Sequence, residues 1–128
     1  MQALIKDRKL EEHVLLLGFI ADEEVIDHYL LADVFAMPSK GEGFGIVYIE
    51  AMACGLAVIA GNKDGSTEAL QFGQLGTLVD PDDAEEVADA LLRVLKQEAQ
   101  PAKVQREMLE CFSFEQFKGR LQEIIATL

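Results

Sequence analysis

Four short apolar runs constrain the fold of this chain more than any other feature of its sequence. Each run is nearly continuous in apolar residues rather than alternating, a pattern that predicts strands of a parallel sheet covered on both faces. Segments with helical spacing separate the runs, so the chain is expected to form a doubly wound α/β unit. The expected strands are residues 14–17, 34–37, 56–60 and 77–79.

The helical segments carry start and stop signals of their own. Asp22 is a candidate cap for a helix whose apolar positions are Val25, Ile26, Tyr29 and Leu30. Further helices are expected over residues 45–54 with Gly55 as the stop, 66–70, 84–96, 102–110, and from a capping box of Ser113 and Gln116 onward. The last one carries an apolar stripe of Phe114, Phe117, Leu121, Ile124, Ile125 and Leu128.

Composition limits the partners and the compartment. A chain of 128 residues has the length of one domain, and its net charge of −12 disfavours nucleic acid and anionic membranes as partners. Two cysteines are too few for a disulfide scaffold. Because no apolar run is long enough for a membrane span or a signal peptide, a cytoplasmic protein with reduced thiols is expected.

The segment with the most chemical information is residues 38–55, where an expected strand ends and a helix begins. Ligands of open parallel sheets bind at such carboxyl edges. Gly41, Gly43 and Gly45 allow the backbone to approach a ligand closely. The first amides of the following helix have no partner within the helix, and the helix dipole is positive there. This junction is therefore a candidate phosphate site.

Two carboxylates flank the candidate phosphate site. Glu42 precedes the helix, and Glu50 lies about one turn inside it. A carboxylate accepts hydrogen bonds from hydroxyl groups, so this layout suits a sugar nucleotide, in which a diphosphate lies between hexose and ribose hydroxyls. Each feature taken alone has a simpler explanation: an ordinary glycine-rich loop, a charge that offsets the helix dipole, or a solvated helix face.

Several ordered motifs resemble those of a known family. They are a Glu, seven residues and a second Glu (EGFGIVYIE, residues 42–50) continuing as AMACG, preceded by VLLLGFI (14–20) and ADVFAMPS (32–39), and followed by GTLVDPDD (76–83). The chain resembles the C-terminal part of a retaining glycosyltransferase of the group 1, family 4-like class, which has the GT-B fold. The resemblance implies a Rossmann-like parallel sheet with helices on both faces.

The resemblance also implies roles for individual residues. Glu42 would be the catalytic-site carboxylate that contacts the donor hexose, and Glu50 would bind the ribose diol. Backbone groups of residues 43–45 would hold the sugar, amides of residues 46 and 47 would face the diphosphate, and residues 18–20 would lie near the base. The implied donor-binding residues are Gly43, Phe44, Gly45, Ile46, Val47, Glu50, Gly18, Phe19, Ile20 and Lys40.

Similar enzymes hold the diphosphate with an Arg and a Lys from a segment N-terminal to anything in this chain. Lys40 and Lys63 are candidates for partial compensation, with solvated loop lysines as the alternative. In the loop at residues 61–68, one glycine, Gly65, stands where the family commonly has a pair, and Asp64 takes the other place. No metal and no cofactor are implied besides the nucleoside diphosphate sugar, which is the donor substrate. Asp80, Asp82 and Asp83 are expected to serve a turn and a helix cap.

The resemblance makes residues 1–128 a nucleotide-sugar-binding domain that lacks its first strands and the N-terminal acceptor domain. The strand at residues 14–17 would have lost its neighbours, which predicts anomalous pairing or a homo-oligomer formed by exchange of a strand or element. A complete enzyme would transfer a hexose to an acceptor hydroxyl with retention, and this chain alone is expected to be inactive.

Two other functional classes stay open. One is a catalytically silent fragment or binding subunit that self-associates or complements a separate N-terminal half. The other is an unrelated nucleotide-binding α/β module.

Overall fold

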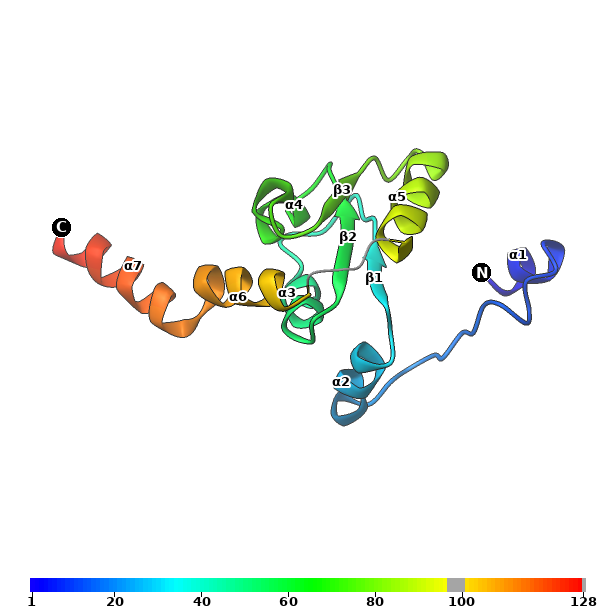
Figure 1. Cartoon of the computed structure of the whole chain (residues 1–128), viewed down its shortest axis with the longest axis horizontal. Coiled ribbons are helices and arrows are strands. Elements are labelled where there is room, and N and C mark those ends of the chain that lie inside the picture. The colour runs from blue at the N-terminus through cyan, green and yellow to red at the C-terminus, as the bar shows by residue number, and fades with distance from the viewer. Residues whose placement is uncertain (97–100, 128) are drawn as a thin grey trace.

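A three-stranded parallel sheet forms the centre of the protein in the computed structural model, which describes residues 1–96 and 101–127 (Figure 1). The strands are β1 (Val34–Met37), β2 (Ala57–Gly61) and β3 (Thr77–Val79), in the order β1-β2-β3. Both pairings of the central strand β2 are parallel. These strands confirm three of the four apolar runs, with β2 shifted by one residue toward the C-terminus.

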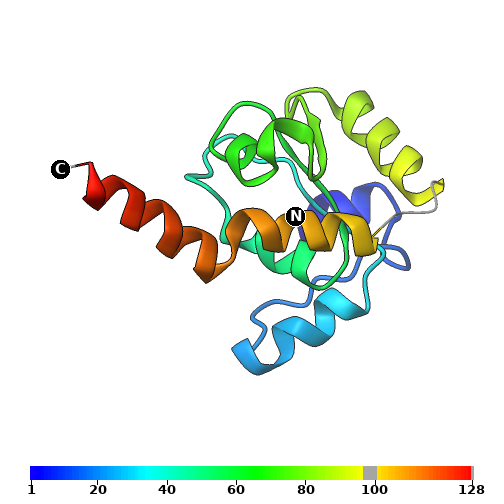
Figure 2. The same cartoon turned by 60° about the vertical axis from the view of Figure 1, so that its left-hand side comes forward.

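Helices cover both faces of the sheet, as expected. On one face lie α3 (Ile46–Ala53), α4 (Ser66–Ala69) and α6 (Pro101–Phe112), and on the other lies α5 (Ala84–Lys96). Figure 2 shows α6 running along α3, while α7 (Phe114–Ala126) continues away from the sheet. A short 3-10 turn, Gln71–Gly73, connects α4 to β3.

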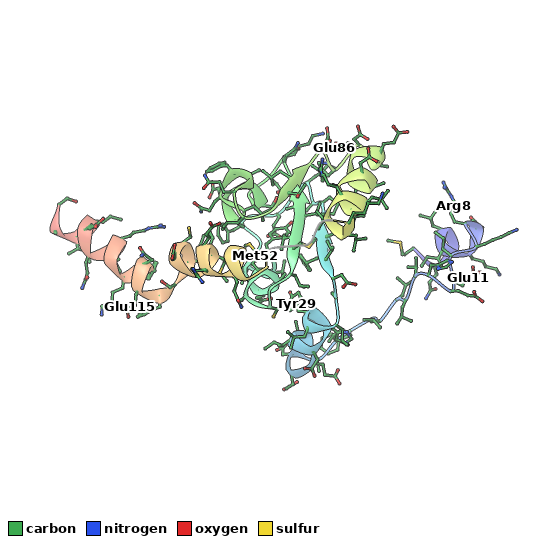
Figure 3. All side chains as sticks on the ribbon, in the orientation of Figure 1. Arg8, Glu11, Tyr29, Met52, Glu86 and Glu115 are labelled. Atoms are coloured by element: carbon green, nitrogen blue, oxygen red, sulfur yellow. The ribbon has the colours of Figure 1, made fainter. Side chains whose placement is uncertain are left out.

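The side chains of β2 divide the core into two clusters because successive residues of a strand point to opposite faces. Val58 and Ala60 pack with Tyr48 and Met52 of α3. Ile59 packs on the other face with residues of β3 and α5. Met52 is labelled in Figure 3, where α3 and α6 meet. The larger cluster lies directly beneath α3, so it anchors the helix that begins at the candidate site.

The prediction of a strand at residues 14–17 is wrong. This segment is extended, but it pairs with no strand of the described chain, and its side chains are 38% to 81% exposed. Apolar character alone does not make a strand, because a parallel strand needs a neighbour that accepts and donates its backbone hydrogen bonds. The segment runs away from the sheet toward α1 (Gln2–Asp7), as Figure 1 shows.

Most helix boundaries agree with their sequence signals. Gly45 is the N-cap of α3, and Gly55 has φ +84° just past its end, as the glycine stop requires. Ser113 Oγ caps α7 by accepting from the Gln116 amide at 3.4 Å. One correction concerns α2 (Asp22–Leu30): Asp22 is its first helical residue, and the N-cap is Ala21, with no side-chain cap bond. The acidic first turn favours the helix through its dipole instead.

Two smaller differences concern the C-terminal helices. Pro101 begins α6, which suits proline because the first turn has no use for its missing N–H, and the helix extends to Phe112. The stripe of α7 is 44% to 71% exposed between Phe114 and Ile125, and Leu128 lies outside the described residues. No helix in the described part of the chain is long and apolar enough to cross a bilayer.

Candidate functional site

The candidate site begins at the junction between β1 and α3. Gly45 has φ +84°, and a Cβ there would lie 2.3 Å from the ring of Tyr48. Tyr48 is fully buried, and its hydroxyl donates to the Met37 carbonyl at 2.8 Å. This bond ties the first turn of α3 to the end of β1. The N-cap residue, Gly45, has no side chain with which to cap α3, so the first amides lie at the open end of the helix.

Glu42 lies on the loop before α3 and is half-buried. Its backbone N–H donates to Asp64 Oδ2 at 2.8 Å, and its carbonyl accepts from the Gly65 amide at 2.9 Å. Its own carboxylate accepts from the Gly43 amide at 3.0 Å. The loop after β2 therefore holds the backbone of Glu42 from both sides, while the side chain turns back over the glycine that follows it.

Glu50 lies on the exposed side of α3, at the wall of a cavity. The hydroxyl of Tyr29, a residue of α2 that is labelled in Figure 3, donates to Glu50 Oε2 at 3.1 Å. Partial burial, together with this bond to the carboxylate, raises the pKa of Tyr29 to about 12. The phenol therefore stays a proton donor at neutral pH. The cavity has a volume of about 550 Å³ and is lined by Asp22, Val25, Ile26, Tyr29, Val47, Glu50, Ala53 and Cys54.

The structure thus groups most of the expected site residues around one helix start. Glu42 precedes the first turn of α3, Val47 and Glu50 line the cavity beside it, and Gly43 and Ile46 are exposed at the junction. The ring of Phe44 is partly buried and packs edge-on against Phe112 at a centroid distance of 5.8 Å. An anion at the open end of α3 would have a carboxylate on each side.

The turn at residues 18–20 is not part of this group. Ile20 lines a separate cavity of about 280 Å³, together with Tyr29 and Phe35. Gly18 has φ +72°, and Phe19 is 91% exposed. The segment lies apart because the run before it forms no strand that would fix its position against the sheet.

Lys40 and Lys63 lie in an exposed ion-pair cluster rather than free beside α3. Lys40 pairs with Asp82, and Lys63 Nζ lies 2.6 Å from Asp80 Oδ1 and 2.9 Å from Asp82 Oδ2. The bonds to Asp80 and Asp82 raise the pKa of Lys63, and the bonds from Lys40 and Lys63 lower the pKa of Asp82.

The three aspartates after β3 also make the turn and cap contacts that were expected. Asp80 Oδ1 accepts from the Asp82 amide at 2.9 Å. Asp83 Oδ1 accepts from the amides of Glu85 and Glu86, both at 3.0 Å, at the start of α5.

Two residues have contacts that the sequence did not assign. Tyr29 appeared only as an apolar position of its helix, and Asp64 only as a departure from a glycine pair. Both bond to site glutamates across a long separation in the chain, 21 residues for Tyr29 and 22 for Asp64. The chemistry of the two side chains could have indicated these contacts. Tyr29 places a phenol on an apolar helix face, and Asp64 places a carboxylate in the turn after the neighbouring strand.

The sequence of this chain is similar to that of known glycosyltransferases. Residues 1–109 match the family described as "Glycosyl transferases group 1". A relative from Mycobacterium tuberculosis, the GDP-mannose-dependent alpha-(1-6)-phosphatidylinositol monomannoside mannosyltransferase, is 40% identical over 102 residues, covering 74% of this chain and 26% of the relative. The chain therefore spans about a quarter of the length of the curated relatives that it matches.

Solved structures agree with the sequence match. HepE of Anabaena, in complex with UDP and glucose, superposes with a TM-score of 0.82 at 27% identity, covering 99% of this chain and 35% of HepE. The C-terminal domain of the group 1 glycosyltransferase LpcC from Francisella tularensis has a TM-score of 0.70 at 28% identity, covering 85% of this chain and 58% of that domain. The fold is thus Rossmann-like and corresponds to part of the C-terminal half of a GT-B enzyme. This chain belongs to the group 1 glycosyltransferases.

Proposed function

We propose that this chain forms the donor-binding domain of a hexosyltransferase that moves a hexose from a nucleoside diphosphate sugar to an acceptor hydroxyl with retention. The observation that carries this proposal is the position of Glu42 and Glu50 on either side of the start of α3, with Glu50 in the wall of a 550 Å³ cavity. HepE supports it, because that structure holds UDP and glucose and superposes on nearly all of this chain.

The proposed roles follow the chemistry of each part. The amides of Ile46 and Val47, at the positive end of the α3 dipole, hold the diphosphate and stabilise its charge as it leaves. Glu42 accepts a hydrogen bond from a hexose hydroxyl, with the backbone of residues 43–45 beside it. Glu50 accepts from the ribose diol, and the apolar cavity wall receives the rest of the nucleoside.

Two further roles are part of the same proposal. Lys40, now paired with Asp82, is exposed and can exchange that partner for a phosphate oxygen. The proposed chemistry involves no metal and no cofactor. The two thiols, Cys54 and Cys111, are free, which suits a cytoplasmic location.

Calorimetry tests the proposal directly. Titration of the chain with GDP-mannose and, separately, with UDP-glucose should give saturable heat with at least one of them. Glu50→Ala should weaken that binding by about tenfold or more, since it removes an ionised acceptor from the ribose site. Glu123→Ala, at an exposed position of α7, is the matched control and should leave the affinity unchanged. Flat titrations of the unmodified chain would contradict the donor site.

A second candidate function is a catalytically silent binding subunit that complements a separate N-terminal half. It is favoured by the exposed apolar stripe of α7, since exposed patches of this kind mark interaction surfaces. The two functions differ in donor binding: saturable heat that Glu50→Ala abolishes would support the donor-binding domain, and flat titrations would support the silent subunit.

A further inference from the structure

Asp64 connects the two loops that form the edge of the candidate site. Its Oδ2 accepts from the Glu42 amide at 2.8 Å, and the neighbouring Gly65 amide donates to the Glu42 carbonyl at 2.9 Å. Both backbone polar groups of Glu42 are therefore bonded to the loop after β2. A residue held at both its N–H and its C=O has little freedom to move relative to its partner loop.

The carboxylate of Asp64 is itself fixed in place. Its Oδ1 accepts from the Ser66 amide at 3.1 Å and lies 2.6 Å from the Ser66 hydroxyl. That hydroxyl is fully buried and lies 2.8 Å from the carbonyl of Gly61, the last residue of β2, so its single proton is shared between this carbonyl and Asp64. Ser66 thus holds Oδ1 of Asp64, and Oδ2 of Asp64 faces the Glu42 amide.

Asp64 carries its charge at neutral pH. Partial burial acts to raise the pKa of this carboxyl, but the hydrogen bonds from Ser66 and from the Glu42 amide outweigh it and lower the pKa. The bond to Glu42 is therefore charge-assisted, which makes it stronger than a neutral one. The donors to this carboxylate come from Glu42, Ser66 and Ser39, and of these Glu42 belongs to the proposed hexose contact, so the role inferred for Asp64 acts through Glu42.

The two loops also touch through their backbones. A Cβ on Gly65 would lie 1.8 Å from the Gly43 carbonyl oxygen, and a Cβ on Gly61 would lie 2.1 Å from that of Ser39. Because Gly61, the last residue of β2, and Gly65, in the loop that follows it, contact the chain on the two sides of Glu42, a shift of that loop also displaces residues 42 and 43.

We propose that Asp64 is a positioning residue for the donor hexose: by fixing the backbone of Glu42, it sets where the Glu42 carboxylate meets the sugar. This inference rests on the proposed function of Glu42 as the hexose contact. It distinguishes the hexose end of the site from the nucleoside end, where Glu50 is held by Tyr29 and not by Asp64.

The test compares donors with and without their hexose. Asp64→Ala should weaken GDP-mannose or UDP-glucose binding by about tenfold and change the affinity for GDP or UDP by less than about twofold. Asp64→Asn keeps one acceptor for the Glu42 amide and should recover part of the loss. Asp89→Ala, at an exposed position of α5, is the matched control and should change neither affinity. Equal weakening of both ligand types by Asp64→Ala would overturn the positioning role.

A second measurement does not depend on the donor. Hydrogen exchange followed by NMR should show a protected Glu42 amide in the unmodified chain and in Asp64→Asn, and rapid exchange at this amide in Asp64→Ala. Unchanged protection of the Glu42 amide in Asp64→Ala would overturn the inference, whatever the result of the donor-binding experiment. If the unmodified chain bound no donor but the Glu42 amide responded as expected, the proposed function would fail while the hold of Asp64 on Glu42 would stand.

Discussion

Tyr29 gives Glu50 a defined orientation before any ligand arrives. Its hydroxyl reaches Glu50 Oε2 at 3.1 Å, while its ring packs edge-on against Phe35 at a centroid distance of 5.7 Å. Phe35 in turn meets Tyr48 at 5.8 Å. A row of three aromatic rings thus runs from the core of the sheet to the carboxylate, and it fixes the phenol from which Glu50 accepts.

Removing only the Tyr29 hydroxyl should weaken nucleotide binding. We expect Tyr29→Phe to lower the affinity for GDP or UDP by about three- to tenfold, because one hydrogen bond to a carboxylate is lost and Glu50 gains rotamer freedom. Calorimetry measures the change. The ring contact with Phe35 remains, so the thermal midpoint should stay close to that of the unmodified chain. A large fall in the midpoint with unchanged nucleotide affinity would show that the hydroxyl serves folding alone.

Single residues divide into those that local sequence reveals and those that it does not. Glu42 and Glu50 could be predicted because they belong to one continuous motif at a strand-to-helix junction. The contacts of Asp64 and Tyr29 could not, because each hydrogen bond joins segments more than 20 residues apart and depends on which strands are neighbours. The ion pair of Lys40 with Asp82 also depends on the close approach of a distant turn.

At the scale of elements, the start of α3 depends on glycine at position 45. Gly45→Ala should destabilise the protein by about 2 kcal/mol or more, since the left-handed backbone is costly for alanine and its Cβ would meet the Tyr48 ring at 2.3 Å. Urea unfolding measures the loss. Gly41→Ala is the control, because a Cβ there would have no neighbour within 4 Å. Equal effects of the two substitutions would contradict this account.

Elements whose signals are local were predicted well. The bounds of β1, β3 and α5 agree with the sequence patterns to the residue, since apolar runs and an amphipathic period between clear breaks describe them fully. The segment at residues 14–17 has the same apolar signal as β1, yet it forms no strand. Strand pairing is a property of the whole sheet, so an apolar run without a neighbouring strand to pair with does not form a strand.

For the whole molecule, the exposed apolar run at residues 14–17 and the outer edge of β1 predict association between two copies. One edge of β1 has no partner among the described strands, and an open strand edge tends to pair with another chain. The charge of −12 on each copy opposes this at low salt. Light scattering should therefore give a mass near 14.1 kDa at low salt and a rise toward twice that value as salt screens the charge.

Two leucine substitutions distinguish this association from non-specific hydrophobic association. Leu16→Lys should suppress the rise in mass, because it places a charge within the apolar run. Leu95→Lys, at an exposed position of α5, should leave the rise unchanged. A constant monomer mass at every salt concentration, or equal suppression by both variants, would contradict exchange through residues 14–17.

The mutual hold between the loops after β1 and β2 also limits how this site can evolve. Gly65 leaves no room for a side chain against the Gly43 carbonyl, and Asp64 must match the position of the Glu42 amide. A change in one loop that moves its backbone therefore requires a compensating change in the other. Among descendants of this sequence, substitutions at positions 42–43 and at positions 64–65 should occur together. New sugar preferences should therefore arise through paired rather than single substitutions.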